Sequence, residues 1–85
     1  MTEFTYCITD EAGIHARPAG LLVKEADKFV SDVEISVGEK NADAKRLFSV
    51  MSLGVKKGDT ITIRISGEDE SAACDAIRDF FESTL

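Results

Sequence analysis

The sequence predicts an α+β fold, an open-faced β-sandwich in which three helices cover one face of a four-stranded antiparallel sheet in the order β-α-β-β-α-β-α. Several segments alternate apolar and polar side chains with the period of a half-buried strand. The segments between them carry apolar side chains three or four residues apart, as amphipathic helices do. The 85 residues contain no linker, low-complexity tract or internal repeat, which predicts one domain spanning residues 1–85.

The alternation predicts strands at residues 4–9, 32–37 and 61–66. Gly38 can supply a tight turn after the second of these, so residues 40–44 are expected to complete a hairpin as a short strand. Because successive side chains of a strand point to opposite faces, the apolar set of each strand faces the helices and the polar set faces solvent.

The helices are expected at residues 17–29, from Leu47 to just before Gly54, and after a cap at Asp69 or Ser71. Gly54 suits the left-handed position that follows a helix. The inward-facing side chains of the first and third helices are Ala19, Leu22, Ala26 and Phe29, and Ala73, Ile77, Phe80 and Phe81.

The second helix carries more large apolar side chains than one face can bury. They are Leu47, Phe48, Val50 and Met51. Since neighbouring positions of a helix point about 100° apart, some of them must face water. Leu47, Phe48 and Met51 would then form a docking patch beside Leu21 and Lys24 of the first helix. The alternative is a core helix that fills a gap in the packing.

The chain carries 16 acidic and 10 basic residues, a net charge of −6. This charge argues against a general affinity for nucleic acid, which a basic face would provide. The acids gather in the C-terminal third, whereas basic residues lie near the first two helices. The asymmetry indicates either a face for an acidic protein partner or ordinary solvated helix faces.

No apolar run approaches the roughly 20 residues that cross a bilayer, and the acidic start of the chain lacks the basic region of a signal peptide. We therefore expect a cytoplasmic protein without membrane insertion. Cys7 and Cys74 are expected to be buried, reduced thiols. With one histidine they are too few for the ligands of a structural zinc site, and the domain is too small for a large buried cofactor, so neither metal nor cofactor is expected.

The only histidine, His15, lies where a loop turns into the first helix. Pro18 fits only the first turn of a helix, so His15 or Ala16 is expected at the N-cap. The N–H groups of a first turn have no partner within the helix, and together with the helix dipole they attract anions. Arg17 adds a permanent cation beside them.

These groups are what a transferable phosphoryl group on histidine requires. The candidate site therefore consists of His15 as acceptor, Arg17 as stabilising cation, and the helix N-terminus at Ala16, Arg17 and Pro18. The alternative is a surface histidine that only caps the helix.

Two motifs carry a family resemblance. Residues 13–19, Gly-Ile-His-Ala-Arg-Pro-Ala, and residues 50–55, Val-Met-Ser-Leu-Gly-Val, resemble HPr, the histidine-containing phosphocarrier of the bacterial sugar phosphotransferase system. The resemblance extends over nearly the whole chain. It implies that enzyme I, charged from phosphoenolpyruvate, phosphorylates Nδ1 of His15, and that the chain passes the group to an enzyme IIA domain in sugar uptake. It also implies a monomeric carrier rather than an enzyme with a reaction of its own.

The resemblance further implies one docking surface for both partners. This surface comprises Gly20, Leu21 and Lys24 of the first helix and Leu47, Phe48 and Met51 of the second. Because donor and acceptor share it, they bind in turn, and a small apolar patch ringed by cations suits weak binding and fast release.

Two positions depart from the family pattern. The regulatory serine of many members would fall at position 46, where this chain has Arg46, which argues against control by a serine kinase there. Ala12 replaces a small polar residue and removes one possible phosphate ligand. Two alternatives belong to other classes, namely an HPr-like regulatory binding module without a role in sugar transport, and a small enzyme such as an acylphosphatase.

Overall fold

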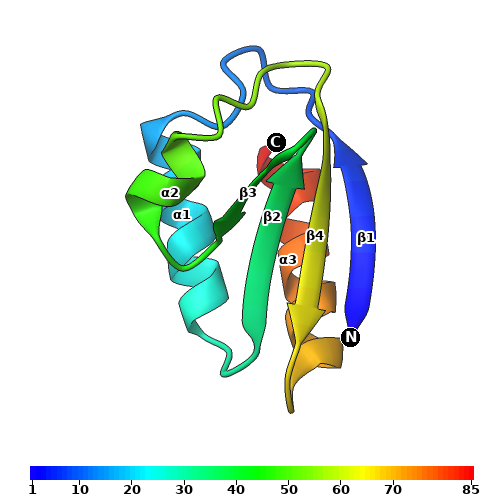
Figure 1. Cartoon of the computed structure of the whole chain (residues 1–85). Coiled ribbons are helices and arrows are strands. Elements are labelled where there is room, and N and C mark those ends of the chain that lie inside the picture. Colours follow the sequence, from blue (N-terminus) through cyan, green and yellow to red (C-terminus); the bar gives the residue numbers. More distant parts are fainter.

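The computed structural model describes residues 1–85 and has the predicted element order (Figure 1). The strands are β1 (Thr2–Cys7), β2 (Asp32–Val37), β3 (Lys40–Asp43) and β4 (Thr60–Ser66), and the helices are α1 (Ala16–Asp27), α2 (Leu47–Met51) and α3 (Glu70–Thr84). The predicted fold class is confirmed, since the four antiparallel strands form one sheet whose helices all lie on the same face. None of the helices combines the length and the apolar character that crossing a bilayer takes.

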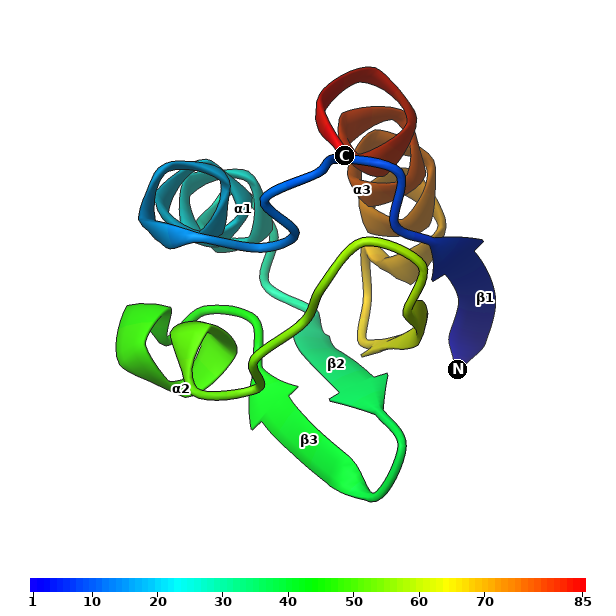
Figure 2. The same ribbon diagram turned by 90° about the horizontal axis from the view of Figure 1, so that it is seen from above.

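The sheet has the strand order β1-β4-β2-β3. Helix α3 packs on β1 and β4, α2 packs on β3, and α1 contacts both other helices. The view from above shows α1 beside α3 on one side and α2 on the other (Figure 2). The first turn of α1 and the last turn of α3 lie at the same end of the molecule (Figure 1), and this end carries the candidate site.

The core lies between the sheet and the helices. The three isoleucines of β4 and Ile35 of β2 have no exposed surface, and neither have Leu22 of α1 and Phe81 of α3. The Phe81 ring lies with its centroid 6.3 Å from that of Phe4 on β1, in an edge-to-face arrangement. Burial of large apolar side chains from every layer fixes α1 and α3 relative to the sheet.

The uncovered face of the sheet is polar. Arg64 of β4 donates hydrogen bonds to Glu3 of β1 and Glu34 of β2, both at 3.2 Å, and these three residues are register neighbours. Exposed ion pairs of this kind contribute little stability. They do join three strands across a face that has no helix to hold it.

Cys7 corrects one expectation, because its thiol is exposed rather than buried. Even-numbered Phe4 and Tyr6 of β1 face the helices, so Cys7 points to the uncovered face. Cys74 on α3 is buried as expected, and both thiols are free.

Helix α1 ends at Asp27, two residues earlier than the apolar spacing indicates. The N–H groups of Lys28 and Phe29 donate to carbonyls three residues back, on Glu25 and Ala26, at 3.3 and 3.2 Å. Such bonds belong to a tighter turn that closes the helix. Phe29 still packs against the core from this turn.

Asp69 occupies the N-cap position of α3 as predicted, but its carboxylate does not cap that helix. Its oxygens instead accept the N–H groups of Val30 and Ser31, both at 3.0 Å, and the Ser31 hydroxyl. Asp69 therefore fastens the turn between α1 and β2 to the start of α3. Gly67 allows this approach, because a Cβ there would lie 2.6 Å from Cα of Ser31.

We expect Asp69→Asn to lower the unfolding temperature at neutral pH, and we expect the difference from the wild-type chain to shrink as the pH falls. The bond from the Ser31 hydroxyl, followed by the N–H groups of Val30 and Ser31, lowers the pKa of Asp69 below its ordinary value. A carboxyl whose folded pKa is lowered contributes stability above the unfolded pKa, about 4, and that contribution disappears as the pH falls through the folded pKa. Thermal unfolding of both chains at pH 7 and pH 3 checks this, and a difference that does not shrink at pH 3 contradicts it.

Candidate functional site

The loop before α1 is anchored by Gly13 to the segment that follows α2. Gly13 has a φ of +66°, and a Cβ there would lie 2.2 Å from the carbonyl oxygen of Val55. The next N–H, that of Ile14, donates to the same oxygen at 3.2 Å. The side chain of Ile14 is buried. Only glycine permits this approach, so the two motifs of the sequence meet here and fix where the following residue, His15, leaves the loop.

His15 is the N-cap residue of α1, with an extended backbone at φ −93° and ψ −172°. Its carbonyl accepts the N–H of Ala19 at 3.0 Å, but its imidazole makes no capping bond and is exposed. The side chain therefore does not serve as a helix cap. Its ring nitrogens are left for chemistry outside the helix.

The first turn of α1 contributes two free donors. The N–H groups of Ala16 and Arg17 precede the first helical hydrogen bond, which starts at Ala19, and neither donates to another atom of the chain. Pro18 has no N–H, so its contribution is the fixed φ of the first turn rather than a hydrogen bond.

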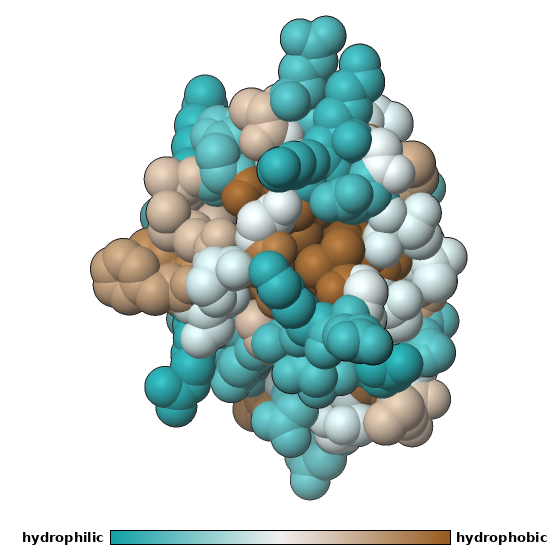
Figure 3. Space-filling view, turned by 45° about the horizontal axis from the view of Figure 1, so that its top comes forward, coloured by the Kyte–Doolittle hydropathy of each residue, from teal (hydrophilic) through white to brown (hydrophobic).

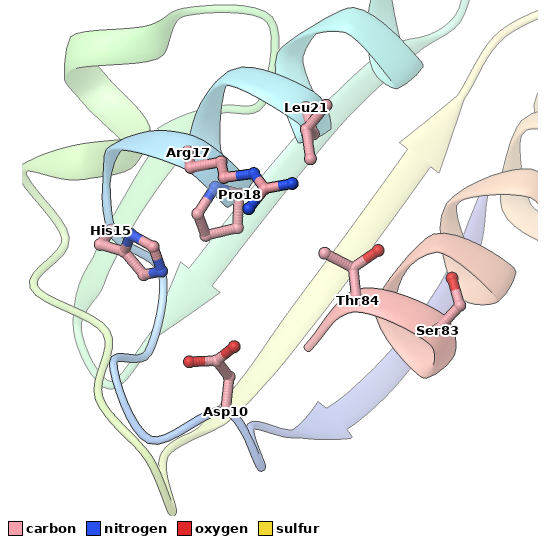
Figure 4. Close-up of a pocket in the computed structure, with 7 residues that line it drawn as sticks. All are labelled: Asp10, His15, Arg17, Pro18, Leu21, Ser83 and Thr84. Atoms are coloured by element: carbon pink, nitrogen blue, oxygen red, sulfur yellow. The ribbon is translucent and has the colours of Figure 1, made fainter.

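A pocket of about 340 Å³ opens beside the imidazole (Figure 4). The residues that line it are Asp10, His15, Arg17, Pro18, Leu21, Ser83 and Thr84. The predicted pair His15 and Arg17 is thus brought into one pocket with Pro18. The Arg17 guanidinium forms none of the chain's ion pairs, and so remains free to meet an anion.

Sequence reasoning missed three residues of this pocket, Asp10, Ser83 and Thr84. Asp10 carries a readable signal, since an aspartate two residues before Ala12 can bond that N–H, and it does so at 2.8 Å. For Ser83 and Thr84 no sequence pattern indicates a place in this pocket. They reach the pocket because Thr9 and Asp10 donate their N–H groups to the backbone oxygen of Leu85 at 2.8 and 3.0 Å.

The apolar side chains of α2 divide as the helix geometry requires. Val50 is buried with 1% of its surface exposed, whereas Leu47 and Met51 are 37% exposed and Phe48 is 81% exposed. Leu21 of α1 is also exposed, at 41%. The prediction that some apolar side chains of α2 face water is confirmed, and the alternative of a fully buried core helix is wrong. In Figure 3 apolar side chains protrude on the side of the molecule where α2 lies.

Exposed cations lie near some of these apolar side chains. Lys24 and Lys28 line a pocket with Leu21, and Arg46, the N-cap residue of α2, directly precedes Leu47. Lys24 forms no ion pair, Lys28 lies 3.1 Å from Glu25, and Arg46 lies 3.8 Å from Asp43. The Arg46 side chain is 78% exposed, so its positive charge is presented to solvent next to Leu47.

A family model and a curated relative both identify the same protein family. A family model described as the phosphorylation site of the PTS HPr component matches residues 2–83. The phosphocarrier protein HPr of Mycoplasma capricolum subsp. capricolum is 44% identical over 78 residues, which cover 92% of this chain and 88% of that protein.

Solved structures agree. The histidine-containing phosphocarrier protein of a mycoplasma has a TM-score of 0.95 at 41% identity, covering 98% of this chain and 94% of that one. An HPr from Thermoanaerobacter tengcongensis has a TM-score of 0.93 at 40% identity, covering 98% and 93%. An HPr from the latter organism also matches as a dimer, with a TM-score of 0.77. The expectation of a monomer therefore stays a prediction.

Proposed function

This chain belongs to the HPr family of phosphocarrier proteins, and on that premise we propose that it accepts a phosphoryl group from enzyme I on Nδ1 of His15 and passes it to an enzyme IIA domain. We place this relay in the cytoplasm, with the chain acting as a carrier and not as an enzyme. The observation that carries the proposal is the exposed imidazole of His15 at the start of α1, in one pocket with the unpaired guanidinium of Arg17. The family assignment leaves the acylphosphatase alternative without support.

The chemistry follows from where the positive groups lie. The N–H groups of Ala16 and Arg17 and the Arg17 guanidinium can bind the phosphoryl oxygens, as helix N-termini and arginines do with other anions. Because the pocket is open, the phosphorus stays accessible from the side opposite the His15 nitrogen. In-line attack by a nucleophile of the next protein can therefore proceed without rearrangement of this chain.

We propose that both partners dock on the exposed apolar patch, defined as Leu21, Leu47, Phe48 and Met51, with Gly20 and Lys24 beside it. The exposure of these four side chains and the free charge of Lys24 support this. A patch of only four side chains suits a transient complex, in which donor and acceptor exclude each other and leave quickly.

The proposal is tested by incubating the chain with enzyme I and phosphoenolpyruvate. We expect a mass gain of one phosphoryl group that is lost in acid and kept in base, as a phosphoramidate on histidine is. Addition of an enzyme IIA domain should then discharge the chain. A chain that gains no mass in the presence of active enzyme I refutes the proposed function.

Phe48→Ala should weaken docking without affecting the fold. Since Phe48 is 81% exposed as a residue, the free energy of unfolding should change by no more than about 0.5 kcal/mol. Loss of an aromatic anchor at the centre of a small interface should lower kcat/KM for transfer from enzyme I by roughly tenfold. Val30→Ala is the matched control, because Val30 is 74% exposed but lies beyond the opposite end of α1. Equal transfer rates for the two variants would contradict the placement of the docking surface on α2.

A further inference from the structure

The pocket beside His15 contains a carboxylate for which the carrier role supplies no use. Asp10 lines the pocket with His15 and Arg17, and its carboxylate points into the pocket (Figure 4). Asp10 forms none of the chain's ion pairs, and neither does Arg17. A negative charge therefore stands unneutralised at the place where a phosphoryl group would be carried.

Three hydrogen bonds hold Asp10 where it is. Its N–H donates to the backbone oxygen of Leu85 at 3.0 Å, and its carbonyl accepts the N–H of Gly13 at 3.0 Å. Its side-chain Oδ1 accepts the N–H of Ala12 at 2.8 Å. This last bond closes a turn of the kind that Asp and Asn form with the backbone two residues on. The carboxylate cannot move away from the pocket without breaking that turn.

The pocket is consequently polarised. Arg17 and the N-terminus of α1 form its positive side. Asp10 forms the negative side with the last turn of α3, where Ser83 and Thr84 line the pocket and the terminal carbonyls carry partial negative charge. A phosphoryl group on His15 would be attracted from one side and repelled from the other.

We propose that the fixed charge of Asp10 destabilises phosphorylated His15 relative to unphosphorylated His15, and so raises the tendency of the chain to pass its phosphoryl group on. This inference rests on the proposed function. Like charges separated by the width of a water-filled pocket repel enough to shift an equilibrium by about three- to tenfold. Arg17 and the helix N-terminus alone would favour a long-lived phosphorylated state, whereas a carrier has to release the group to its acceptor. Asp10 thus acts on the equilibrium by its charge, through repulsion of the phosphoryl group on His15.

Competition for one pool of phosphoryl groups tests this. Phosphorylated wild-type chain is mixed with unphosphorylated Asp10→Asn chain labelled with ¹⁵N, together with a catalytic amount of enzyme I, and the phosphorylated fraction of each is read by mass spectrometry. The P–N bond broken on one His15 is replaced by a P–N bond on the other, and a proton moves in the opposite direction. The equilibrium ratio therefore reports only the surroundings of His15.

Asparagine keeps the side-chain oxygen that accepts the N–H of Ala12 and removes the charge. We expect the phosphoryl group to favour the Asp10→Asn chain by about three- to tenfold. The preference should shrink at 1 M salt, where charges are screened over about 3 Å.

Glu11→Gln is the matched control. Glu11 lies in the same loop, 3.7 Å from Lys57, and does not line the pocket, so its loss removes an equal charge and should leave the ratio near one. Asp10→Ala loses both the charge and the turn. It should give the same equilibrium ratio as Asp10→Asn, because the proposal assigns the effect to the charge. A ratio near one for Asp10→Asn, or an equal preference for Glu11→Gln, overturns the proposal. Failure of enzyme I to phosphorylate either chain refutes instead the proposed function, and this inference with it.

Discussion

Replacing His15 with alanine is expected to abolish phosphorylation by enzyme I completely while leaving the unfolding temperature almost unchanged. His15 is the only histidine of the chain, so no second imidazole can accept the group. Its side chain is exposed and makes no hydrogen bond to the helix, so its removal takes no hydrogen bond and little buried surface from the fold. Exposed substitutions of this kind change stability by about 0.5 kcal/mol or less.

Two measurements on the same preparation check this prediction. Incubation with enzyme I and phosphoenolpyruvate should give no mass gain, and thermal unfolding should follow the wild-type curve. Arg17→Ala is an informative companion, because it leaves the nucleophile in place and removes the cation of the pocket. It should still be phosphorylated, only more slowly. Residual phosphorylation of His15→Ala would locate the phosphoryl group on another residue and contradict the assignment of the site.

The centre of the site could be predicted from sequence because its parts are neighbours in the chain. Pro18 fixes the start of α1, and this alone places His15, the free N–H groups and Arg17 within one turn of each other. The fold class was also predictable from local sequence. Because helices cover only one face of the sheet, the side chains of a strand alternate between buried and exposed. In β4 the apolar side chains of Ile61, Ile63 and Ile65 are the buried ones, as the alternation in the sequence indicates.

The rest of the site depends on contacts between distant segments. Ser83 and Thr84 lie at the other end of the chain from His15, and nothing in their residue types indicates that α3 ends beside the loop before α1. The same limit applies to Asp69. Its position before a helix predicts that its carboxylate caps that helix. The carboxylate instead accepts the N–H groups of Val30 and Ser31, because the turn after α1 packs against the start of α3. Local patterns identify candidate hydrogen-bonding groups, and tertiary packing selects their partners.

The second motif of the sequence has a structural function as well as a proposed docking function. Met51 of this motif and Phe48, two residues before it, face solvent, while Val50, Leu53 and Val55 of the motif are buried. The carbonyl oxygen of Val55 then accepts the N–H of Ile14, next to His15. The segment that presents the apolar patch thus also holds the loop of the phosphoryl acceptor. A partner that docks on the patch is thereby positioned relative to the imidazole.

Gly13→Ala is expected to be the most destabilising single-methyl change at the site. A φ of +66° costs an alanine about 1–2 kcal/mol. In addition, the new Cβ would lie 2.2 Å from the Val55 carbonyl oxygen and 2.8 Å from Cα of Lys56, both of them backbone atoms. The loop must therefore move away from the segment that holds it. We expect a loss of about 2–4 kcal/mol in the free energy of unfolding, or roughly 10–25 °C in the unfolding temperature.

Gly38→Ala separates the two causes. Gly38 has a similar φ of +59°, but a Cβ there would meet no atom within 4 Å. Urea unfolding of this variant should therefore show only the conformational cost, about 1–2 kcal/mol. The excess loss in Gly13→Ala measures the contact with Val55. The displaced loop should also slow phosphorylation of His15 in Gly13→Ala and not in Gly38→Ala, since the imidazole and the first turn of α1 are carried by that loop. Equal stability losses and equal phosphorylation rates in the two variants would show that the approach of Gly13 to Val55 does not position His15.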